Sequence, residues 1–422
     1  MKKETGFVQE GLFKVFDSCK RNKSKIAEFE DKGMNIIKEC LVYGQLRIAE
    51  WFVDNGVNVN IVESEGKTPL SYACQQANSI LIKKIAEKSS EETIKKSYSM
   101  YYAIRSSNVE HLNMLLSIGF SIDEVTPDGD KLLVPALRAI NGDTGQEEDR
   151  INQLNIVDCL VKQGAPLDRK VKKEIKRLSA VDVLILTGVL VHCYKFNLHE
   201  LLVFFIKNGL SAHKQNTQSK NAFEFFIERG EIEIIKLILE HSTSTEIQHT
   251  SALVAARNNL KIVRILLEND VRTTYNQRHN PNPILNYVAY HIEHYYSKEF
   301  IEVLLENGAD VNAKNYYSWT PLVELLVISE GNEGKQKEFF DLLMKYNPKI
   351  DDTDISSGFM KNELAHIDDV LDVAIYQNRF DWFDPYLATL PEETQEFFES
   401  KQFKKLLKVD KEPISLSRYH LA

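Results

Sequence analysis

A recurring block of apolar residues is the strongest pattern along this chain. Its clearest copy precedes Gly308 and consists of Phe300, Ile301, Val303, Leu304 and Leu305. Counted back from the glycine, these are positions −8, −7, −5, −4 and −3, which share one face of an α-helix. The block therefore predicts a helix that buries one face and ends at a residue suited to the left-handed conformation.

The same block occurs nine times, and we number these repeats one to nine. The residues that end the nine predicted helices are Gly56, Ser89, Gly119, Gly164, Gly209, Ser242, Asp270, Gly308 and Asn347. Only Lys84 and His111 depart from the apolar pattern at the five positions. The ends lie 28 to 45 residues apart, which leaves room in each repeat for a turn and a further helix.

A second signal shows where that further helix begins. Thr68-Pro69-Leu70 and Thr320-Pro321-Leu322 each follow a polar turn, Glu65-Gly66-Lys67 in the first case. A threonine can cap a helix, and proline suits the first helical turn because its missing N–H costs nothing there. Each repeat should therefore contain a hairpin, a first helix, a short connection and a second helix.

These features resemble the ankyrin repeat, most fully in residues 304–322, LLENGADVNAKNYYSWTPL. The resemblance implies an all-α ankyrin-repeat solenoid of about nine to ten helix–turn–helix units with helical caps. In the family, a histidine after Thr-Pro-Leu ties neighbouring hairpins together. Ser71 and Val323 stand there in this chain, so we expect hairpins that are less rigid than usual.

The repeat boundaries predict the division of the chain. The expected parts are a helical cap at 1–33, repeats at 34–350, a degenerate tenth repeat at 351–390, and a C-terminal helix and tail at 391–422. Insertions are expected near 141–151, 166–180, 275–283 and 330–335. Pro385 lies where the tenth repeat would place its second helix, so that helix should be short or broken.

Composition narrows the class of protein. The 422 residues carry a net charge of −9, and no apolar run reaches the ~18 residues of a membrane-spanning helix. Five widely spaced cysteines without a CxxC motif indicate reduced thiols. No signal-type stretch follows Met1, so we expect a cytoplasmic protein, or one delivered into host cytoplasm without a classical signal peptide.

The sequence offers little sign of catalytic chemistry. His291 and His294 share a helix face, with His279 upstream, but no carboxylate or cysteine at ligand spacing joins them. Cys193 adjoins His192, yet neighbours in a helix point in different directions. Phosphate-binding and hydrolase motifs are absent from the sequence. We therefore expect no catalytic residue, no metal and no cofactor.

Charge is distributed unevenly along the chain. Arg169–Arg177 is a basic run that includes Glu174, and residues 351–399 hold 13 acidic and 2 basic side chains. The basic run should be a solvated helix; its functional alternatives are contact with an acidic patch on a partner or with a membrane surface. Nucleic acid is not expected as a partner.

Partner-binding residues are predicted from their place in the repeat. The resemblance puts hairpin tips and exposed first-helix positions on the concave surface through which ankyrin repeats contact proteins. In this chain those positions are Tyr316, Tyr317, Trp319, Val327 and Ile328 in repeat nine, and Lys67, Gln75 and Gln76 in repeat two. Aromatic residues in exposed positions are common anchors of protein interfaces, although they could instead pack on a neighbouring hairpin.

The function predicted from these observations is a protein–protein interaction scaffold or inhibitor, acting as a monomer. The composition also resembles ankyrin effectors that intracellular bacteria deliver into host cells, and a Glu-rich stretch at 392–399 precedes a basic tail. The alternative is an enzyme with an active site in the C-terminal region that uses the repeats to dock its substrate.

Overall fold

The computed structural model describes most of the chain. The residues that it does not describe are 1, 32–33, 64–65, 77, 141–146, 182–188, 215–220, 244–245, 247–250, 272–273, 278–279, 296, 316, 328–331, 351–369, 377–378, 390–391, 393–394 and 397–422. The chain divides into two compact parts, Met1–Ser219 and Lys220–Ala422. Each part is described by itself below.

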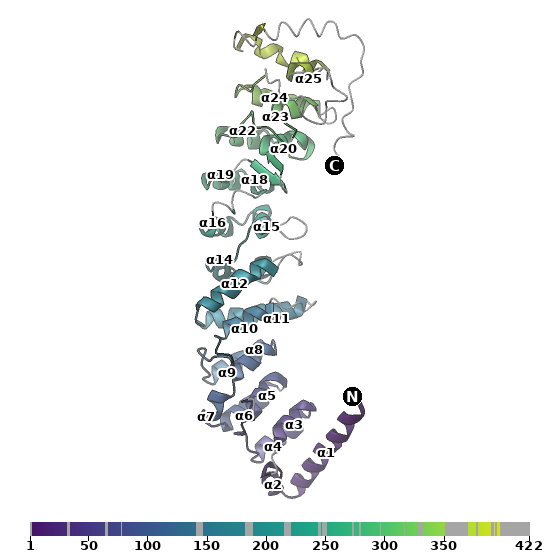
Figure 1. Ribbon diagram of the computed structural model, residues 1–422, viewed down its shortest axis with the longest axis vertical. Helices are drawn as coiled ribbons and strands as arrows, with labels where there is room; N and C mark the ends of the chain where they lie inside the picture. Colours follow the sequence, from purple (N-terminus) through teal and green to yellow (C-terminus); the bar gives the residue numbers. More distant parts are fainter. Residues whose placement is uncertain are drawn as a thin grey trace. The chain divides into compact units, whose positions relative to one another are not determined.

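The N-terminal part is built from helix pairs (Figure 1). Its first helices are α3 (Ile36–Val42), α5 (Pro69–Gln76), α8 (Ser99–Arg105), α10 (Leu133–Ile140) and α13 (Val189–Lys195). Its second helices are α4 (Leu46–Asp54), α6 (Ser79–Lys88), α9 (Val109–Ser117), α11 (Glu147–Lys162) and α14 (His199–Lys207). Outside the pairs lie α1 (Lys2–Arg21), α2 (Lys25–Asp31), α7 (Glu91–Lys96) and α12 (Arg169–Val181).

The pairs of this part stack in two rows. In the row of first helices α3 contacts α5, α5 contacts α8, α8 contacts α10 and α10 contacts α12. In the row of second helices α4 contacts α6, followed in turn by α9, α11 and α14. The extra helix α12 therefore extends the row of first helices beyond α10.

The C-terminal part repeats the helix pairs (Figure 1). Its first helices are α15 (Ala222–Arg229), α18 (Ala252–Ala256), α20 (Ile284–Tyr290), α23 (Pro321–Val327) and α25 (Val370–Tyr376). Its second helices are α16 (Ile232–His241), α19 (Leu260–Glu268), α22 (Lys298–Glu306) and α24 (Glu333–Met344), and two shorter helices are α21 (Ile292–Tyr295) and the 3₁₀ helix η3 (Phe380–Thr389). Strands β1 (Thr274–Gln277) and β2 (Asn280–Pro283) pair antiparallel, with Thr274 opposite Pro283.

The predicted array of helix pairs is confirmed, and all nine predicted second helices are present. Each ends one to three residues before its predicted helix end. Every glycine among those ends has a positive φ, as do Asp270 (59°) and Asn347 (52°). Ser89 and Ser242 instead adopt extended backbone, with φ of −79° and −90°. Serine lacks the tolerance for the left-handed region that glycine, asparagine and aspartate have.

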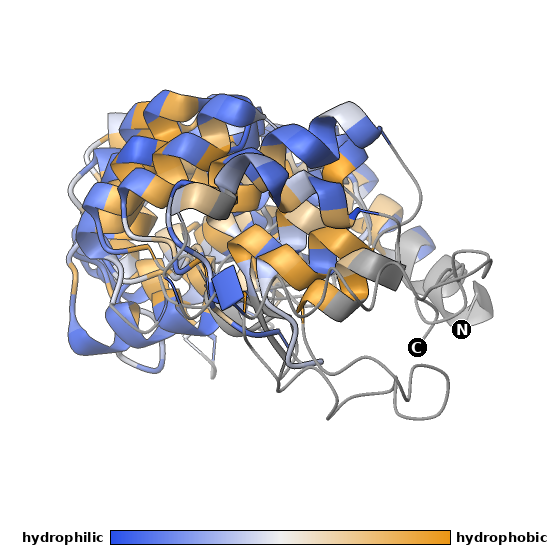
Figure 2. Cartoon of the chain, turned by 90° about the horizontal axis from the view of Figure 1, so that it is seen from above, coloured by the Kyte–Doolittle hydropathy of each residue, from blue (hydrophilic) through white to orange (hydrophobic). Residues whose placement is uncertain are grey.

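The apolar block forms the core of each repeat. Positions −7 and −4 are buried in all nine repeats, whereas position −5 is half-buried in repeats one to seven. Figure 2 shows apolar (orange) and polar (blue) residues together along the helices. Of the two exceptions, Lys84 reaches Glu50 (2.7 Å) and Asp54 (3.0 Å) on α4. His111 is buried, and its Nδ1 lies 3.2 Å from the carbonyl oxygen of Cys74.

Polar side chains in the hairpins of repeats two and nine bond to the backbone that follows the second helix of the same repeat. Asn60 accepts a hydrogen bond from the backbone N–H of Ser90 (2.6 Å), and Asn312 accepts one from that of Lys349 (2.7 Å). The hydroxyl of Ser71 donates to the carbonyl oxygen of Ser97, two residues before α8, at 2.5 Å. Ser71 thus links repeat two to the residues before α8, at the position where we expected a less rigid hairpin.

Three of the four expected insertions correspond to distinct elements. The segment 166–180 forms most of α12, 275–283 forms the β1–β2 hairpin, and part of 141–151 lengthens α11. Residues 330–331 lie outside the described residues, and α24 begins at Glu333. In the tenth repeat a 3₁₀ helix containing Pro385 follows α25. The predicted C-terminal helix and tail at 391–422 fall mostly outside the described residues.

Candidate functional site

The hairpin of repeat nine (311–320) is organised by one asparagine. Asn315 Oδ1 accepts hydrogen bonds from the backbone N–H groups of Tyr317 (2.9 Å) and Trp319 (3.0 Å). Its Nδ2 donates to Glu324 Oε2 on α23 at 2.7 Å. Ser318 closes the turn with a φ of 63°. The asparagine therefore fixes both the turn and its position against the first helix.

The aromatic residues of this hairpin do not share one environment. Trp319 is 7% exposed, so it belongs to the core and not to the exposed surface on which we expected it. Tyr317 is half-buried, and its ring centroid lies 5.5 Å from that of Trp319. Tyr316 lies outside the described residues. The buried ring of Trp319 thus packs against the ring of Tyr317.

The expected apolar patch on α23 is also absent at Val327, which is only 2% exposed. All seven residues of α23 are buried. The reason is the packing of this helix, which contacts α20, α24 and α25. Ile328, the other predicted residue of the patch, lies outside the described residues.

A buried carboxyl group lies under the repeat-nine hairpin. Glu324 is 5% exposed, and this burial raises its pKa to about 8, against the opposing effect of a hydrogen bond from Asn286. Burial, reinforced by Glu324 and Tyr317, also raises the pKa of Tyr290. Asn286 Nδ2 donates to the carbonyl oxygen of Trp319 at 2.8 Å. At neutral pH the group beneath the hairpin is mainly the neutral acid.

The hairpin of repeat two (59–68) has the same backbone but a polar surrounding. Glu63 accepts hydrogen bonds from Tyr72 Oη (2.7 Å), Lys38 Nζ (3.1 Å) and Asn35 Nδ2 (3.2 Å). Burial would raise the pKa of Glu63, but these three donors, Tyr72 first among them, outweigh it and lower the pKa. Glu63 is therefore an ion held by its donors.

The predicted residues of repeat two are accessible. Lys67 and Gln75 are half-buried, and Gln76 is exposed. The ammonium group of Lys67 lies 6.0 Å from the centre of the Tyr72 ring. The neighbouring positions 64–65 lie outside the described residues. Repeat two thus presents a polar surface where the repeat pattern places partner contacts.

A third hairpin of the same kind was missed from the sequence. The N–H of Thr126 donates to the carbonyl oxygen of Asp130 (2.9 Å), and Gly129, with a φ of 76°, closes the turn. The run Thr126-Pro127-Asp128-Gly129 is a strong turn signal that could have revealed it. It was overlooked because no Thr-Pro-Leu follows.

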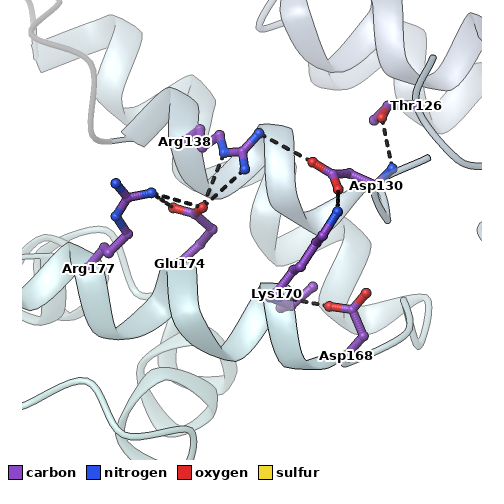
Figure 3. A network of polar contacts seen from close by, with 8 residues as sticks. Thr126, Asp130, Arg138, Asp168, Lys170, Glu174 and Arg177 are labelled. Carbon is purple, nitrogen blue, oxygen red and sulfur yellow. Dashed lines mark hydrogen bonds and ion pairs between the residues drawn. The ribbon is translucent and has the colours of Figure 1, made fainter. Parts of the chain in front are cut away.

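This third hairpin carries a network of charged groups (Figure 3). Asp130 pairs with Lys170 Nζ (2.6 Å) and Arg138 Nη1 (3.3 Å), and Glu174 pairs with Arg138 (3.2 Å) and Arg177 (3.2 Å). The hydrogen bond from Lys170, the strongest influence, lowers the pKa of Asp130. Ion pairs thus link the hairpin at 126–130 to α10 and α12.

The cysteine and histidine side chains that could serve catalysis or metal binding are packed against other parts of the fold. Burial raises the pKa of Cys40 to about 12 and also raises that of Cys74. Cys159 is half-buried, and its Sγ lies 3.1 Å from Asn113 Oδ1. His291 is surrounded by tyrosine rings, with that of Tyr290 at 4.5 Å.

The described residues also bear on metal binding and on membrane insertion. Among them, no group of three or more His, Cys, Asp or Glu side chains is placed to hold a metal ion. In the same part of the chain, no helix has the length and apolar character needed to cross a membrane. His279, the third histidine of the candidate metal site, lies outside it.

Comparison with known proteins agrees with the repeat architecture. The family model for ankyrin repeats (3 copies) matches residues 33–126 and 190–278. No curated protein matches the chain. Among solved structures, the human ASB11 ankyrin repeat domain is similar at 15% identity and a TM-score of 0.29, covering 55% of this chain and 96% of that one. With the helix pairs, hairpins and capped turns described above, the matched segments show that the chain contains ankyrin repeats.

Proposed function

We propose that this protein binds a protein partner on the surface formed by its hairpins and first helices, without chemistry of its own. Ankyrin repeats act in protein–protein interaction, and this much follows from the family. The observation that carries the finer proposal is the accessibility of Lys67, Gln75, Gln76 and Tyr317 at hairpin and first-helix positions that the core does not use. A scaffold or an inhibitor would use such a surface.

The burial of Trp319 and Val327 changes the expected contact in repeat nine. Tyr317 is the aromatic side chain of this hairpin that remains partly accessible among its described residues. Its ring lies against the buried indole of Trp319, so it loses little side-chain entropy on binding. A tyrosine held in this way suits an interface anchor.

The proposal is tested by quantitative capture of partners from eukaryotic cytosol. The variants are Tyr317→Ala and Lys67→Ala/Gln76→Ala, and the control is Tyr346→Ala, which removes a tyrosine that is 40% exposed after α24. We expect a partner in stoichiometric amount whose capture falls at least about fivefold in one of the two variants and not in the control. Equal capture by all four proteins would contradict the assignment of the surface.

The enzymatic alternative remains a separate proposal. Its active site would fall in the C-terminal region, where residues 351–369 lie outside the described residues. An activity screen of the full chain tests it. Turnover of a substrate that survives Tyr317→Ala and Lys67→Ala/Gln76→Ala would favour the enzyme over the binding protein.

Delivery into host cytoplasm as a bacterial effector is proposed only on the sequence. The Glu-rich stretch at 392–399 and the basic residues after it support it. A reporter enzyme fused to the chain would measure translocation into host cells. Loss of signal on replacing Glu392, Glu393 and Glu396 with alanine is expected, and an unchanged signal would contradict this role of the segment.

A further inference from the structure

The insertion helix α12 occupies a place that the ankyrin pattern does not provide. It contacts α10 and extends the row of first helices, α3, α5, α8 and α10, within the N-terminal part (Figure 1). The proposed protein-binding surface is formed by the first helices and hairpins. A charged face on α12 therefore belongs to the candidate binding surface.

The inner face of α12 is buried and its outer face is basic. Val171, Ile175 and Leu178 are at most 1% exposed and lie on one side of the helix. The exposed residues Arg169, Lys172, Lys173 and Lys176 fall on the opposite side, at helical spacings of three and four. Within Arg169–Arg177, Glu174 is the one carboxylate, and it is 3% exposed. The outer face thus carries charge of one sign.

Buried carboxylates hold this helix in a fixed orientation (Figure 3). Arg138 on α10 bridges Asp130 and Glu174, and Lys170 and Arg177 bind one carboxylate each. Both carboxylates have side chains at most 8% exposed. The flanking cations are therefore neutralised, while the outer face keeps a concentrated positive charge in a chain of net charge −9.

We propose that the outer face of α12, formed by Arg169, Lys172 and Lys173, binds an acidic segment of a protein partner. This inference rests on the proposed protein-binding function and specifies the chemistry of the partner. Cations three and four residues apart on a helix are spaced by about 6 Å. Alternate side chains of an extended segment repeat at about 7 Å, so an acidic strand can match successive cations.

Two other polyanions fit this face less well. Stable binding of a helix to a lipid surface uses an apolar face in addition to charge, and Val171, Ile175 and Leu178 of α12 are buried in the protein. The net charge of −9 opposes binding of a long nucleic acid outside this short face. An acidic protein segment needs only the length of the helix.

The test uses the purified full chain and a fluorescein-labelled peptide of alternating Glu and Ser, with a Gln–Ser peptide of equal length as probe control. The variant Arg169→Gln/Lys172→Gln/Lys173→Gln removes three charges from the outer face and keeps good helix formers. The matched control, Lys83→Gln/Lys95→Gln/Lys96→Gln, removes three exposed lysines from α6 and α7. Fluorescence anisotropy gives the affinity, and circular dichroism checks that helicity is equal.

We expect the wild type and the matched control to bind the Glu peptide alike, and the α12 variant at least about tenfold more weakly. The reversed variant, Arg169→Glu/Lys172→Glu/Lys173→Glu, should bind a Lys–Ser peptide instead. Equal weakening in the matched control, or no preference for Glu over Gln, would overturn the proposal. So would binding to phosphatidylserine vesicles without binding to the peptide. Because Tyr317, Lys67 and Gln76 are untouched, their capture experiment reports separately on the proposed function.

Discussion

The hairpins of repeats two and nine share backbone hydrogen bonds and differ in their surroundings. In each, an N–H donates across the turn, from Glu63 to Lys67 (2.9 Å) and from Asn315 to Trp319 (3.0 Å). Each has a left-handed residue before the last position, Gly66 at 73° and Ser318 at 63°. Each also bonds to its first helix nine residues on, Glu63 to Tyr72 and Asn315 to Glu324, at 2.7 Å in both.

The side chains around these backbones differ in burial and charge. Lys67 is half-buried, whereas Trp319 at the matching position is in the core. The carboxylate of Glu63 is an ion held by three donors, whereas Glu324 is buried with its pKa raised to about 8. The repeat motif thus specifies the turn, and neighbouring helices decide whether a side chain in it faces solvent or core.

Trp319→Ala tests this difference with the largest expected effect. Removing a buried tryptophan costs about 3–5 kcal/mol through lost apolar contact and the cavity left behind. Lys67→Ala, at the matching position of repeat two, should change stability by less than about 0.5 kcal/mol because surface substitutions rarely do more. Urea unfolding followed by circular dichroism measures both. Similar effects in the two variants would show that the hairpins are not as different as their burial indicates.

Glu324→Gln should stabilise the protein, and more so as the pH rises. The pKa of Glu324 is raised to about 8 in the folded chain, so folding retains a proton that the unfolded chain releases above about pH 4.5. Its ionisation therefore costs stability between about pH 5 and 8. Glutamine keeps an oxygen to accept from Asn315 and has no charge to lose.

The gain in stability at pH 8.5 should be about 1–3 kcal/mol and should nearly vanish at pH 5. Melting temperatures of the variant and wild type at the two pH values provide the comparison. Glu306→Gln, at an exposed position on α22, is the control and should show no such pH dependence. A gain that is equal at both pH values would contradict a proton held by Glu324.

The sequence was sufficient to locate the second helices of the repeats. The apolar block located all nine second helices because helical periodicity depends on local spacing alone. Glycine, aspartate and asparagine also marked left-handed helix ends correctly, and serine did not, because the conformational tolerance of a residue is a local property.

The exposure of side chains was harder to predict because it depends on residues that are distant in the sequence. Val327 is buried on α23, which packs against α20, α24 and α25, and no local pattern near it reveals this packing. Arg169–Arg177 was predicted as a solvated helix, yet its place in the row of first helices depends on Asp130 and Arg138, more than 30 residues away. The repeat motif therefore located the candidate surface, but which side chains lie on it could be determined only from the tertiary contacts.

Glu63→Gln should have the opposite pH dependence to Glu324→Gln. The pKa of Glu63 is lowered by its donors, so its charge stabilises the fold above the unfolded value of about 4.5, and this is lost as pH falls through the folded pKa. We expect a loss of about 1–2 kcal/mol at pH 7 that shrinks by pH 3.5. Thermal melts at both pH values measure this loss of stability. Glu87→Gln, at an exposed position on α6, is the control. A loss independent of pH would point to packing instead of charge.

The smallest expected effect concerns the left-handed residue of each turn. Ser318→Gly should stabilise repeat nine by about 0.5 kcal/mol, since relief of backbone strain exceeds the entropy gained by the unfolded chain. Gly66→Ser should destabilise repeat two by a similar amount. A Cβ at Gly66 would meet only Tyr98, at 3.7 Å, which is an ordinary contact, so the cost would come from the backbone. Denaturant midpoints of the two variants should move in opposite directions; movement in the same direction would mean that side-chain contacts of these residues outweigh the shared backbone.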